Sequence, residues 1–571
     1  MLGPGGTSVS VKLSNGKNVV AEAATTVQVA NGASTWKACL TPQVAGGSYT
    51  VTAVCSGCTN STPAVLQRVT FGDVWYCAGQ SNMALPLAHT LSRNISRDAI
   101  LDGKYGNIRI HGISGNMNPT QPWSTLKAAI ATNTDSDQSL FGGYSSTCYY
   151  FAESLSDELA KQPGGAPPIG MVHTAWGGSM IEQWLSNESL KQCSQTAVGS
   201  SNAMWHESRV LPYVDMTLKG FVWYQGENDM HGYFGNSEQK SGYSCMMETL
   251  VAEWRTLWSA TPGTTDPLAP FGLVTLAPSG GEGGKSMGAM RFAQTSSYGV
   301  APNPALPKVF VAQAYDLNDP WSNDTCYGKV HCHDNSVAPP GGWGFGCDGY
   351  CASVKTSNWY MGPIHPRDKK PVGLRLAQLA MPVAYGTKGW STGPTLAGCS
   401  VSDSKITVRF NKTLLAQGGS DAIKIQPYYE GNVVIGKTAY NVVGSKMDVL
   451  VNASDFCMQE AGGRDGGCWD DGTGKNYSYS VNESAWIAVD IEAGSNPNEV
   501  VVDLSRAGGK AVAIRYGWEG DCCTGRPPTS DPCPIASCPI MGSDSNLPAN
   551  PFIAHIVDGA CKCISPQVCD E

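Results

Sequence analysis

The chain has 571 residues, with 42% hydrophobic and 15% charged side chains, and its formal net charge is -9. One hydrophobic core does not organise a chain of this length, so we expect two to four domains. An acidic chain without a Lys/Arg-rich run is not expected to bind nucleic acid or an anionic membrane, because both attract basic surfaces.

Residues 1–70 are predicted to form an N-terminal β region. Three segments alternate apolar and polar residues with a period of two, which is typical of strands that bury one face. Asn-Gly and Gly-Gly turns separate them. These segments are residues 7–13, 25–30 and 47–54.

Residues 71–391 are predicted to form an α/β catalytic domain, because short apolar strands alternate there with helices. The predicted strands are Asp73–Ala78, Asn107–Ile113, Pro168–His173, Gly220–Gln225, Phe271–Leu276 and Val309–Tyr315. The predicted helices include residues 149–162, 245–258 and 288–297 and a stretch after His365 with an apolar face of Leu374, Leu376, Ala377, Leu379 and Ala380. Such alternation predicts a mostly parallel sheet that is covered on both faces.

Two regions differ from this pattern. Residues 320–362 are rich in Cys, Gly and Trp without clear periodicity, and we expect a disulfide-tied insertion. Its His331-Cys332-His333 run hints at a metal site, but disulfide packing explains it better, and we expect no metal. Residues 392–571 are predicted to be β-rich, with strands in residues 404–410, 422–429, 447–451 and 484–491 and a Cys-rich tail. The two terminal β regions form one accessory domain or two.

The cysteines and glycosylation sequons indicate a secreted or lysosomal protein. The chain has 21 cysteines, which is unusual in a reducing cytosol, and the odd number leaves at least one thiol unpaired or bonded to another chain. Asn-x-Ser/Thr sequons occur at Asn60, Asn94, Asn187, Asn323, Asn411, Asn452, Asn476 and Asn482. The first five residues do not resemble a signal peptide, so we expect a truncated N-terminus rather than an unusual export route. No apolar run approaches the ~20 residues that span a bilayer.

Four stretches at the ends of predicted strands carry polar residues with small neighbours. They are GQSNM (79–83), WGGSMIEQW (176–184), WYQGEND (223–229) and GPIHPRDK (362–369). Ligands of parallel α/β sheets bind beyond the carboxyl ends of the strands. We therefore expect one crevice to hold Ser81, Gly177, Asn228 and Asp316.

These residue types fit acyl transfer by a serine, which needs a nucleophile, a base and donors for the oxyanion. Ser81 supplies a hydroxyl, and His365 is a candidate base. The backbone N–H groups of Gly177 and Gly178 and the side-chain amide of Asn228 are candidate oxyanion donors. Ser81 is not in a Gly-x-Ser-x-Gly sequence, so the α/β-hydrolase elbow is not the pattern.

Each feature also has a purely structural explanation. Alone, Ser81 is better explained as a polar turn, and His365 as a surface residue. The glycine pair is also explained by a strand-to-helix turn, which is compatible with an oxyanion role. Tryptophans flank the motifs, and most are expected in the core while one or two could stack on a sugar; they are Trp75, Trp176, Trp184 and Trp223.

Taken together and in this order, the four stretches resemble the SGNH hydrolases and, among them, the sialate O-acetylesterase family. This resemblance covers roughly residues 30–571. It implies a flavodoxin-like three-layer α/β/α catalytic domain, to which we add β-sandwich-like accessory regions at both ends. It implies Ser81 as nucleophile and His365 as base.

For the other site residues, the resemblance implies an oxyanion hole formed by the Ser81 N–H, a glycine of Gly177-Gly178 and the Asn228 amide. Gln225 is the alternative to Asn228. Gln80, Gln225 and Glu227 are expected to bind substrate, while Glu227 also has a structural explanation. Gln80 and Asn82 are expected to fix the loop around Ser81.

The group that orients His365 is the open question. Many SGNH enzymes carry an Asp three residues before the catalytic His, but this chain has Gly362 there. The YDLND stretch supplies Asp316, or alternatively Asp319, for the role. A backbone carbonyl is a further alternative.

The predicted function is removal of O-acetyl groups from a carbohydrate by a serine esterase, without a cofactor. The resemblance implies acetyl esters of sialic acid, as a small molecule or in a glycan, as the substrate. Acetylated cell-wall polysaccharide is the rival substrate, and an inactive carbohydrate-binding relative is the alternative of another class. The residues do not indicate an oligomeric state.

Overall fold

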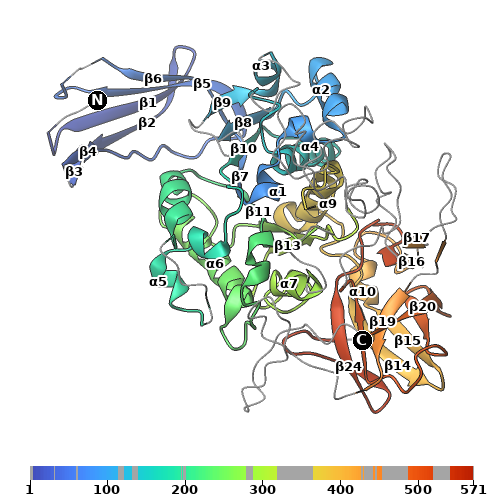
Figure 1. The fold of residues 1–571 in the computed structure, drawn as a ribbon. Coiled ribbons are helices and arrows are strands. Elements are labelled where there is room, and N and C mark those ends of the chain that lie inside the picture. Colours follow the sequence, from blue (N-terminus) through green and yellow to red (C-terminus); the bar gives the residue numbers. More distant parts are fainter. Residues whose placement is uncertain are drawn as a thin grey trace, which may run out of the picture.

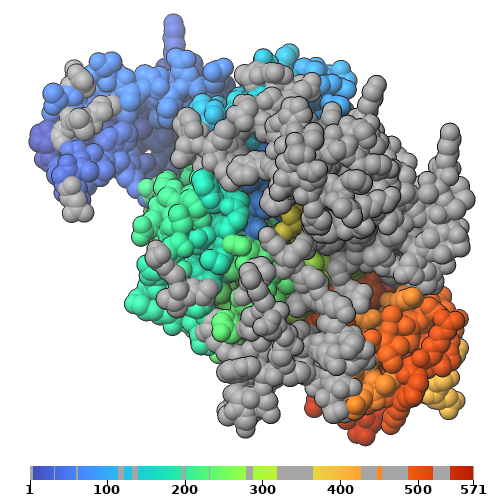
Figure 2. All heavy atoms as spheres, viewed as in Figure 1, coloured from blue at the N-terminus to red at the C-terminus, as the bar shows by residue number. Residues whose placement is uncertain are grey.

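The fold is taken from a computed structural model of the chain (Figure 1). It describes residues 4–30, 32–59, 62–112, 121–131, 139–194, 196, 201–277, 287–317, 364–425, 428–429, 442–443, 446–452, 486–518 and 540–569. The whole of the predicted Cys-rich insertion (residues 320–362), including residues 326–333, and Asp319 therefore lie outside the described residues. The β region near the N-terminus and the β-rich part near the C-terminus lie at opposite ends of the molecule (Figure 2).

The N-terminal residues form β-strands, as predicted, and four of these strands make one antiparallel sheet. The strand order of this sheet is β2-β1-β5-β6. Between β2 and β5 in the sequence, β3 and β4 form a separate two-stranded sheet. Alternate residues of β1, such as Val9, Val11 and Leu13, are buried, which accounts for the period of two. The strands are β1 (Ser8–Asn15), β2 (Asn18–Thr26), β3 (Gln28–Ala30), β4 (Ala33–Thr35), β5 (Gly46–Cys55) and β6 (Ala64–Phe71).

The central sheet has seven strands in the order β13-β12-β11-β7-β10-β8-β9. Its first six strands are parallel, and β9 pairs antiparallel with β8 at one edge. All six strands predicted between residues 71 and 391 are present, so the mostly parallel sheet is confirmed. The strands are β7 (Asp73–Gly79), β8 (Ile108–Gly112), β9 (Gln121–Thr125), β10 (Ile169–His173), β11 (Gly220–Tyr224), β12 (Phe271–Val274) and β13 (Val309–Ala312).

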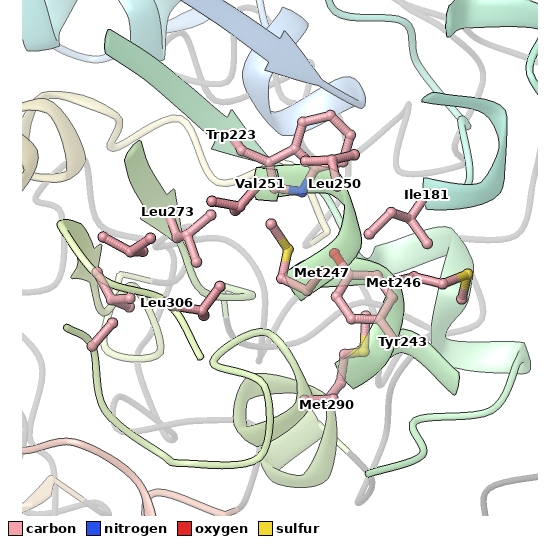
Figure 3. Packing of buried hydrophobic residues seen from close by; sticks show 14 of the residues in the cluster. Ile181, Trp223, Tyr243, Met246, Met247, Leu250, Val251, Leu273, Met290 and Leu306 are labelled. Carbon is pink, nitrogen blue, oxygen red and sulfur yellow. The ribbon is translucent and has the colours of Figure 1, made fainter. Parts of the chain in front are cut away.

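Helices pack on both faces of this sheet. Successive side chains of a strand point to opposite faces, and in β7 Trp75 packs with α4 (Ser146–Ala160) and α9 (Lys370–Tyr385), whereas Tyr76 packs with α6 (Gly242–Trp258). Figure 3 shows the second of these cores, where Trp223 and Leu273 of the sheet lie near Leu250 and Val251 of α6. One detail of the predicted α9 face is wrong: Leu374 is exposed, because it faces away from the sheet.

The remaining helical segments are short. They are α1 (Ser81–Ala84), η1 (Leu87–His89), α2 (Arg93–Leu101), α3 (Leu126–Ile130), η2 (Ile181–Trp184), α5 (Asn187–Leu190), η3 (His206–Val210), η4 (Leu211–Tyr213), η5 (Glu227–His231), α7 (Met287–Ala293) and α10 (Lys412–Leu415). Several of them start directly after a strand of the central sheet and carry the predicted site residues.

The C-terminal region forms a closed barrel, which corrects the prediction of a sandwich-like region. Its strands close in the order β14-β15-β21-β20-β19-β22-β24-β25, and β25 returns to β14 at Ala560 and Ser400. Period-two alternation is the same in a sandwich and a barrel, so only the long-range pairing distinguishes them. The barrel strands are β14 (Leu396–Ser402), β15 (Lys405–Phe410), β19 (Lys446–Leu450), β20 (Ile487–Ala493), β21 (Glu499–Asp503), β22 (Ala513–Tyr516), β24 (Phe552–Val557) and β25 (Ala560–Cys563).

Two further strand pairs lie outside the barrel sheet. They are β16 (Ile423–Ile425) with β23 (Ile540–Gly542), and β17 (Tyr428–Tyr429) with β18 (Val442–Val443). None of the described strands near the C-terminus pairs with a strand of the N-terminal sheet.

The described part of the chain contains disulfides, as the cysteine content predicted, and three of them join segments more than 50 residues apart. The bonds are Cys55–Cys58, Cys77–Cys148, Cys193–Cys245, Cys399–Cys561 and Cys563–Cys569. Cys39 is unpaired and exposed. In the described part of the chain, every helix is too short or too polar to cross a membrane.

Candidate active site

Strand β7 ends in a tight turn that presents Ser81. Gly79 has a φ of 133°, and a Cβ there would lie 2.1 Å from the carbonyl oxygen of Tyr224, so only glycine fits. The Gln80 N–H donates to the same Tyr224 oxygen at 2.9 Å. Ser81 then begins α1 and remains half-buried, while both of its neighbours are buried. The turn therefore leaves Ser81 as the accessible residue of the three.

Gln80 holds the loop that follows β11. Its side-chain oxygen accepts hydrogen bonds from the Gly226 N–H at 3.1 Å, the Asn228 N–H at 3.3 Å and the Gln225 amide at 3.1 Å. Gln225 is fully buried and also donates to the Ser179 carbonyl at 2.9 Å and accepts from the Tyr243 hydroxyl at 2.9 Å. These contacts of Gln80 and Gln225 are all with protein groups. A direct contact of either residue with substrate stays a prediction.

Asn82 joins the Ser81 turn to the segment that contains His365. The Asn82 side chain is fully buried. Its amide donates to the Ile364 carbonyl at 2.8 Å and to the Glu227 carboxylate, and its oxygen accepts from Lys369 at 2.7 Å. The predicted role of Asn82 in fixing this loop agrees with these bonds. Glu227 is likewise buried and tied to Asn82, so its predicted contact with substrate also stays a prediction.

His365 lies directly after the residue that Asn82 binds. It is half-buried, whereas Arg367 and Lys369 behind it are about 1% exposed. The Arg367 carbonyl accepts a hydrogen bond from the Leu91 N–H at 3.2 Å, which fixes the segment a second time. Asn82 and Ile364 share a hydrogen bond, and each is the sequence neighbour of a candidate catalytic residue. Ser81 precedes Asn82, and His365 follows Ile364. A direct bond between the Ser81 hydroxyl and His365 stays a prediction.

The two predicted groups of oxyanion donors lie in contact with each other. The Trp176 N–H donates to the Gly79 carbonyl at 2.9 Å, which places the Gly177-Gly178 turn beside the end of β7. Gly178 is exposed and has a φ of 71°. The Asn228 side-chain amide donates to the Gly178 carbonyl at 2.7 Å. An amide NH₂ carries two donors, and this bond uses one of them.

Asp316 is fully buried and pairs with an arginine. The Arg375 guanidinium, on α9, contacts both Asp316 oxygens, one of them at 2.6 Å, and also donates to the Gln313 carbonyl at 2.6 Å. A two-pronged pair of this kind fixes both partners. Because α9 begins five residues after His365, Asp316 anchors the helix that follows this histidine in the chain. Orientation of the imidazole by Asp316 stays a prediction.

A buried pair of acids in the same region was missed. Asp229 and Glu182 are both buried and hydrogen-bonded to each other. Burial, above all, and the nearby Glu182 charge raise the pKa of Asp229 well above its usual value. Asp229 also accepts from the Ile181 N–H at 3.2 Å and from the Gln225 amide. Both acids lie inside the motifs, but only the tertiary structure shows that they meet.

The tryptophans beside the motifs are mostly core residues, as predicted. Trp75, Trp184 and Trp223 are at most 1% exposed. Trp176 is half-buried, with its ring 4.5 Å from that of Trp205 between centroids. Of these four, only Trp176 is accessible to a ligand.

Comparison with known proteins shows what this chain is similar to. Residues 71–320 match the family described as "Carbohydrate esterase, sialic acid-specific acetylesterase". Over 580 residues the chain is 28% identical to a sialate O-acetylesterase of Pongo abelii, with 97% of this chain and 88% of that protein covered. The identity to the Homo sapiens sialate O-acetylesterase is 27% over 579 residues, with the same coverage.

Among solved structures, a carbohydrate acetylesterase from Xanthomonas citri has a similar fold. Its TM-score is 0.59 at 21% identity, with 96% of this chain and 93% of that chain covered. The structural likeness concerns the fold. The family match and the relatives confirm the resemblance to sialate O-acetylesterases that the motifs predicted, and with it a carboxylic ester hydrolase.

Proposed function

We propose that this chain is a serine esterase that removes O-acetyl groups from sialic acid through an acetyl-serine intermediate. The observation that carries the proposal is the Gln80-Ser81-Asn82 turn. Gln80 binds the loop of Asn228 and Asn82 binds the segment of His365, while Ser81 between them is accessible. A carbohydrate-binding relative without activity would need neither a nucleophile nor a base.

In the proposed reaction, His365 takes the proton of the Ser81 hydroxyl as its oxygen bonds to the acetyl carbon. The tetrahedral intermediate collapses, the bond from the acetyl carbon to the sugar oxygen breaks, and His365 returns the proton to that oxygen. Water then attacks the acetyl-serine, again with His365 as base. Acetate leaves and the Ser81 hydroxyl is restored.

The developing oxyanion would be bound by the Ser81 N–H, an N–H of Gly177-Gly178 and the Asn228 amide. Hydrogen bonds fixed before the reaction stabilise this charge most. Gln80 supports the arrangement, because its side-chain oxygen accepts a hydrogen bond from the Asn228 N–H. We assign Gln80, Gln225 and Glu227 to holding these loops around the substrate.

We further propose that residues 71–391 form a catalytic unit of the SGNH type, with accessory regions in residues 1–70 and 392–571. The parallel sheet with helices on both faces and the position of Ser81 beyond β7 support this assignment. We place the protein outside the cytosol, secreted or lysosomal. The disulfides among the described residues support that location, because such bonds persist in oxidising compartments.

Hydrolysis of a small aryl acetate tests the mechanism. Ser81→Ala is expected to reduce kcat by at least about 10³-fold, because the acetyl-serine cannot form. Ser92→Ala removes a hydroxyl from another half-buried serine and is expected to keep full activity. Thermal unfolding of both variants shows whether each is folded. Equal activity of the wild type and Ser81→Ala would contradict the proposal.

A substrate panel tests the proposed sugar. We expect higher kcat/KM with O-acetylated sialic acids than with acetylated xylan or pectin. A preference for the polysaccharides would retain the esterase mechanism and reject sialic acid as the substrate.

The oxyanion assignment predicts the effect of Asn228→Ala. Loss of one donor is expected to lower kcat by about 10²–10³-fold with a smaller change in KM. Asn546→Ala, at a loop next to the barrel strands, serves as a control for truncation of an asparagine. An unchanged kcat for Asn228→Ala would remove Asn228 from the oxyanion hole.

A further inference from the structure

A pocket lies at the opposite end of the central sheet from Ser81. Its volume is about 460 Å³, and it is lined by β6, by β9 and by the first residues of β7, β8 and β10. Ser81 lies two residues beyond the end of β7. Seven residues separate Gly72 from Gly79, and a strand rises about 3.3 Å per residue, so the two sites are roughly 20 Å apart. Figure 1 shows the N-terminal sheet next to the part of the central sheet that contains β8, β9 and β10.

An exposed tryptophan forms part of the wall. Trp123 is 42% exposed, although tryptophan is usually well buried. Its ring stacks on His111 at a centroid distance of 5.0 Å, and a Cβ at Gly170 would lie 3.0 Å from it. The ring is therefore held in place while much of it remains accessible. Such a surface suits the apolar C–H face of a sugar ring.

The pocket is also basic, in an acidic protein. Arg68 and Arg109 line it, and none of the described lining residues is Asp or Glu. Arg109 donates to the Arg68 carbonyl at 3.0 Å, which ties β8 to β6. Guanidinium groups bind carboxylates with two parallel hydrogen bonds. Gln67 and Thr70 add neutral hydrogen-bonding groups.

We propose that this pocket binds a sugar that carries a carboxylate, such as a terminal sialic acid, at a site separate from the catalytic one. The volume suits one or two sugar rings, the exposed ring suits the sugar face, and the arginines suit its charge. The site would retain a glycan that bears several acidic sugars and raise the concentration of its other sugars near Ser81. Binding at this pocket does not require catalysis by Ser81.

The test is a titration of the Ser81→Ala protein with 3′-sialyllactose, followed through the ¹⁵N–¹H indole signal of Trp123. The signal is identified as the one of 16 tryptophan signals that disappears in Trp123→Phe. We expect 3′-sialyllactose to shift it, more weakly at high salt because the contact is ionic, and neutral lactose to leave it in place. Arg68→Gln is expected to raise the Kd about tenfold or more. Lys104→Gln, which removes a charge elsewhere on the surface, is expected to leave the Kd unchanged.

Three results would overturn the proposal: no shift at millimolar 3′-sialyllactose, an equal shift with lactose, or an unchanged Kd in Arg68→Gln. Turnover of the aryl acetate by Arg68→Gln in an otherwise wild-type chain is expected to stay unchanged. Failure of the proposed esterase would appear in that turnover, whereas failure of this pocket would appear in the indole signal.

Discussion

At the scale of single residues, burial separates the roles of three neighbours. Gln80 and Asn82 are buried and satisfied by hydrogen bonds to other segments, whereas Ser81 stays half-buried. Buried polar groups are retained where they have partners, so both amides have a structural reason to be present. The sequence GQSN therefore combines one reactive position with two that hold loops.

Gly79→Ala tests the turn that presents Ser81. The added Cβ would lie 2.1 Å from the backbone oxygen of Tyr224, and a backbone atom in a central strand has little room to move. We expect a loss of several kcal/mol in the free energy of unfolding and loss of esterase activity. Thermal unfolding and aryl acetate hydrolysis measure both.

Gly103→Ala is the matched control, since Gly103 also has a positive φ, 93°, but no atom within 4 Å of the added Cβ. It is expected to cost about 1 kcal/mol. Equal effects of the two substitutions would mean that the close approach to Tyr224 does not matter.

At the scale of elements, short helical segments after neighbouring strands are bonded to one another. Asp229 in η5 accepts from the Ile181 N–H at the start of η2 and also contacts Gln225 and Glu182. It thereby connects the loops after β10 and β11, which carry the oxyanion candidates. Burial, above all, and the Glu182 charge raise the pKa of Asp229, which favours its protonated form in the folded protein.

Asp229→Asn tests this connection through pH. The folded-state pKa of Asp229 is raised, so its bound proton contributes to the free energy of unfolding. This contribution is complete below the unfolded pKa of about 3.9, and it is lost as the pH rises through the folded-state pKa. Asparagine keeps the uncharged form. The free energy of unfolding of the variant, relative to wild type, is therefore expected to increase between pH 4.5 and 8.

Denaturant titrations across this range measure that difference, with Asp102→Asn on the surface as the control. A difference that stays constant or falls with increasing pH would show that Asp229 does not hold a proton in the folded protein.

At the scale of the whole molecule, contacts between distant segments assemble the site. Asn82 and Ile364 are 282 residues apart in the chain and share a hydrogen bond. Asp316 and Arg375 tie the loop after β13 to α9, and the Cys77–Cys148 bond ties β7 to α4. The His365 segment is thus held by the Ser81 turn through Asn82, and the helix that follows it is held by the loop after β13.

Asp316→Ala tests the buried ion pair of Asp316 with Arg375. Removal of one partner leaves the Arg375 charge buried and uncompensated, so we expect a loss of about 3–5 kcal/mol in the free energy of unfolding. Glu492→Ala breaks the exposed pair with Lys405 and is expected to cost less than about 1 kcal/mol. Chemical denaturation measures both.

Asp316→Asn shows whether Asp316 only anchors α9 or also orients the His365 imidazole. If Asp316 only anchors α9, Asp316→Asn lowers stability with little change in the pH profile of kcat/KM. A displaced pH profile in a folded Asp316→Asn protein would support orientation of His365 by this carboxylate.

The sequence alone determined the order of the parallel strands along the chain, the helices between them and the four motifs. These features depend on local periodicity and on the residues at strand ends, which are visible within a short window. The resemblance to sialate O-acetylesterases followed from the same motifs. The roles of Gln80 and Asn82 as loop-fixing residues were also predictable, because both flank the candidate nucleophile in a turn.

Only the tertiary structure decided what depends on pairing across long distances. The closure of β25 onto β14, the partner of Asp316, the meeting of Asp229 with Glu182 and the pocket of Trp123 each join residues from separate segments. Period-two alternation specifies which face of a strand is buried but not which strand lies beside it. Neighbours in space are selected by the packing of the whole chain, and their chemistry becomes visible only after that packing is known.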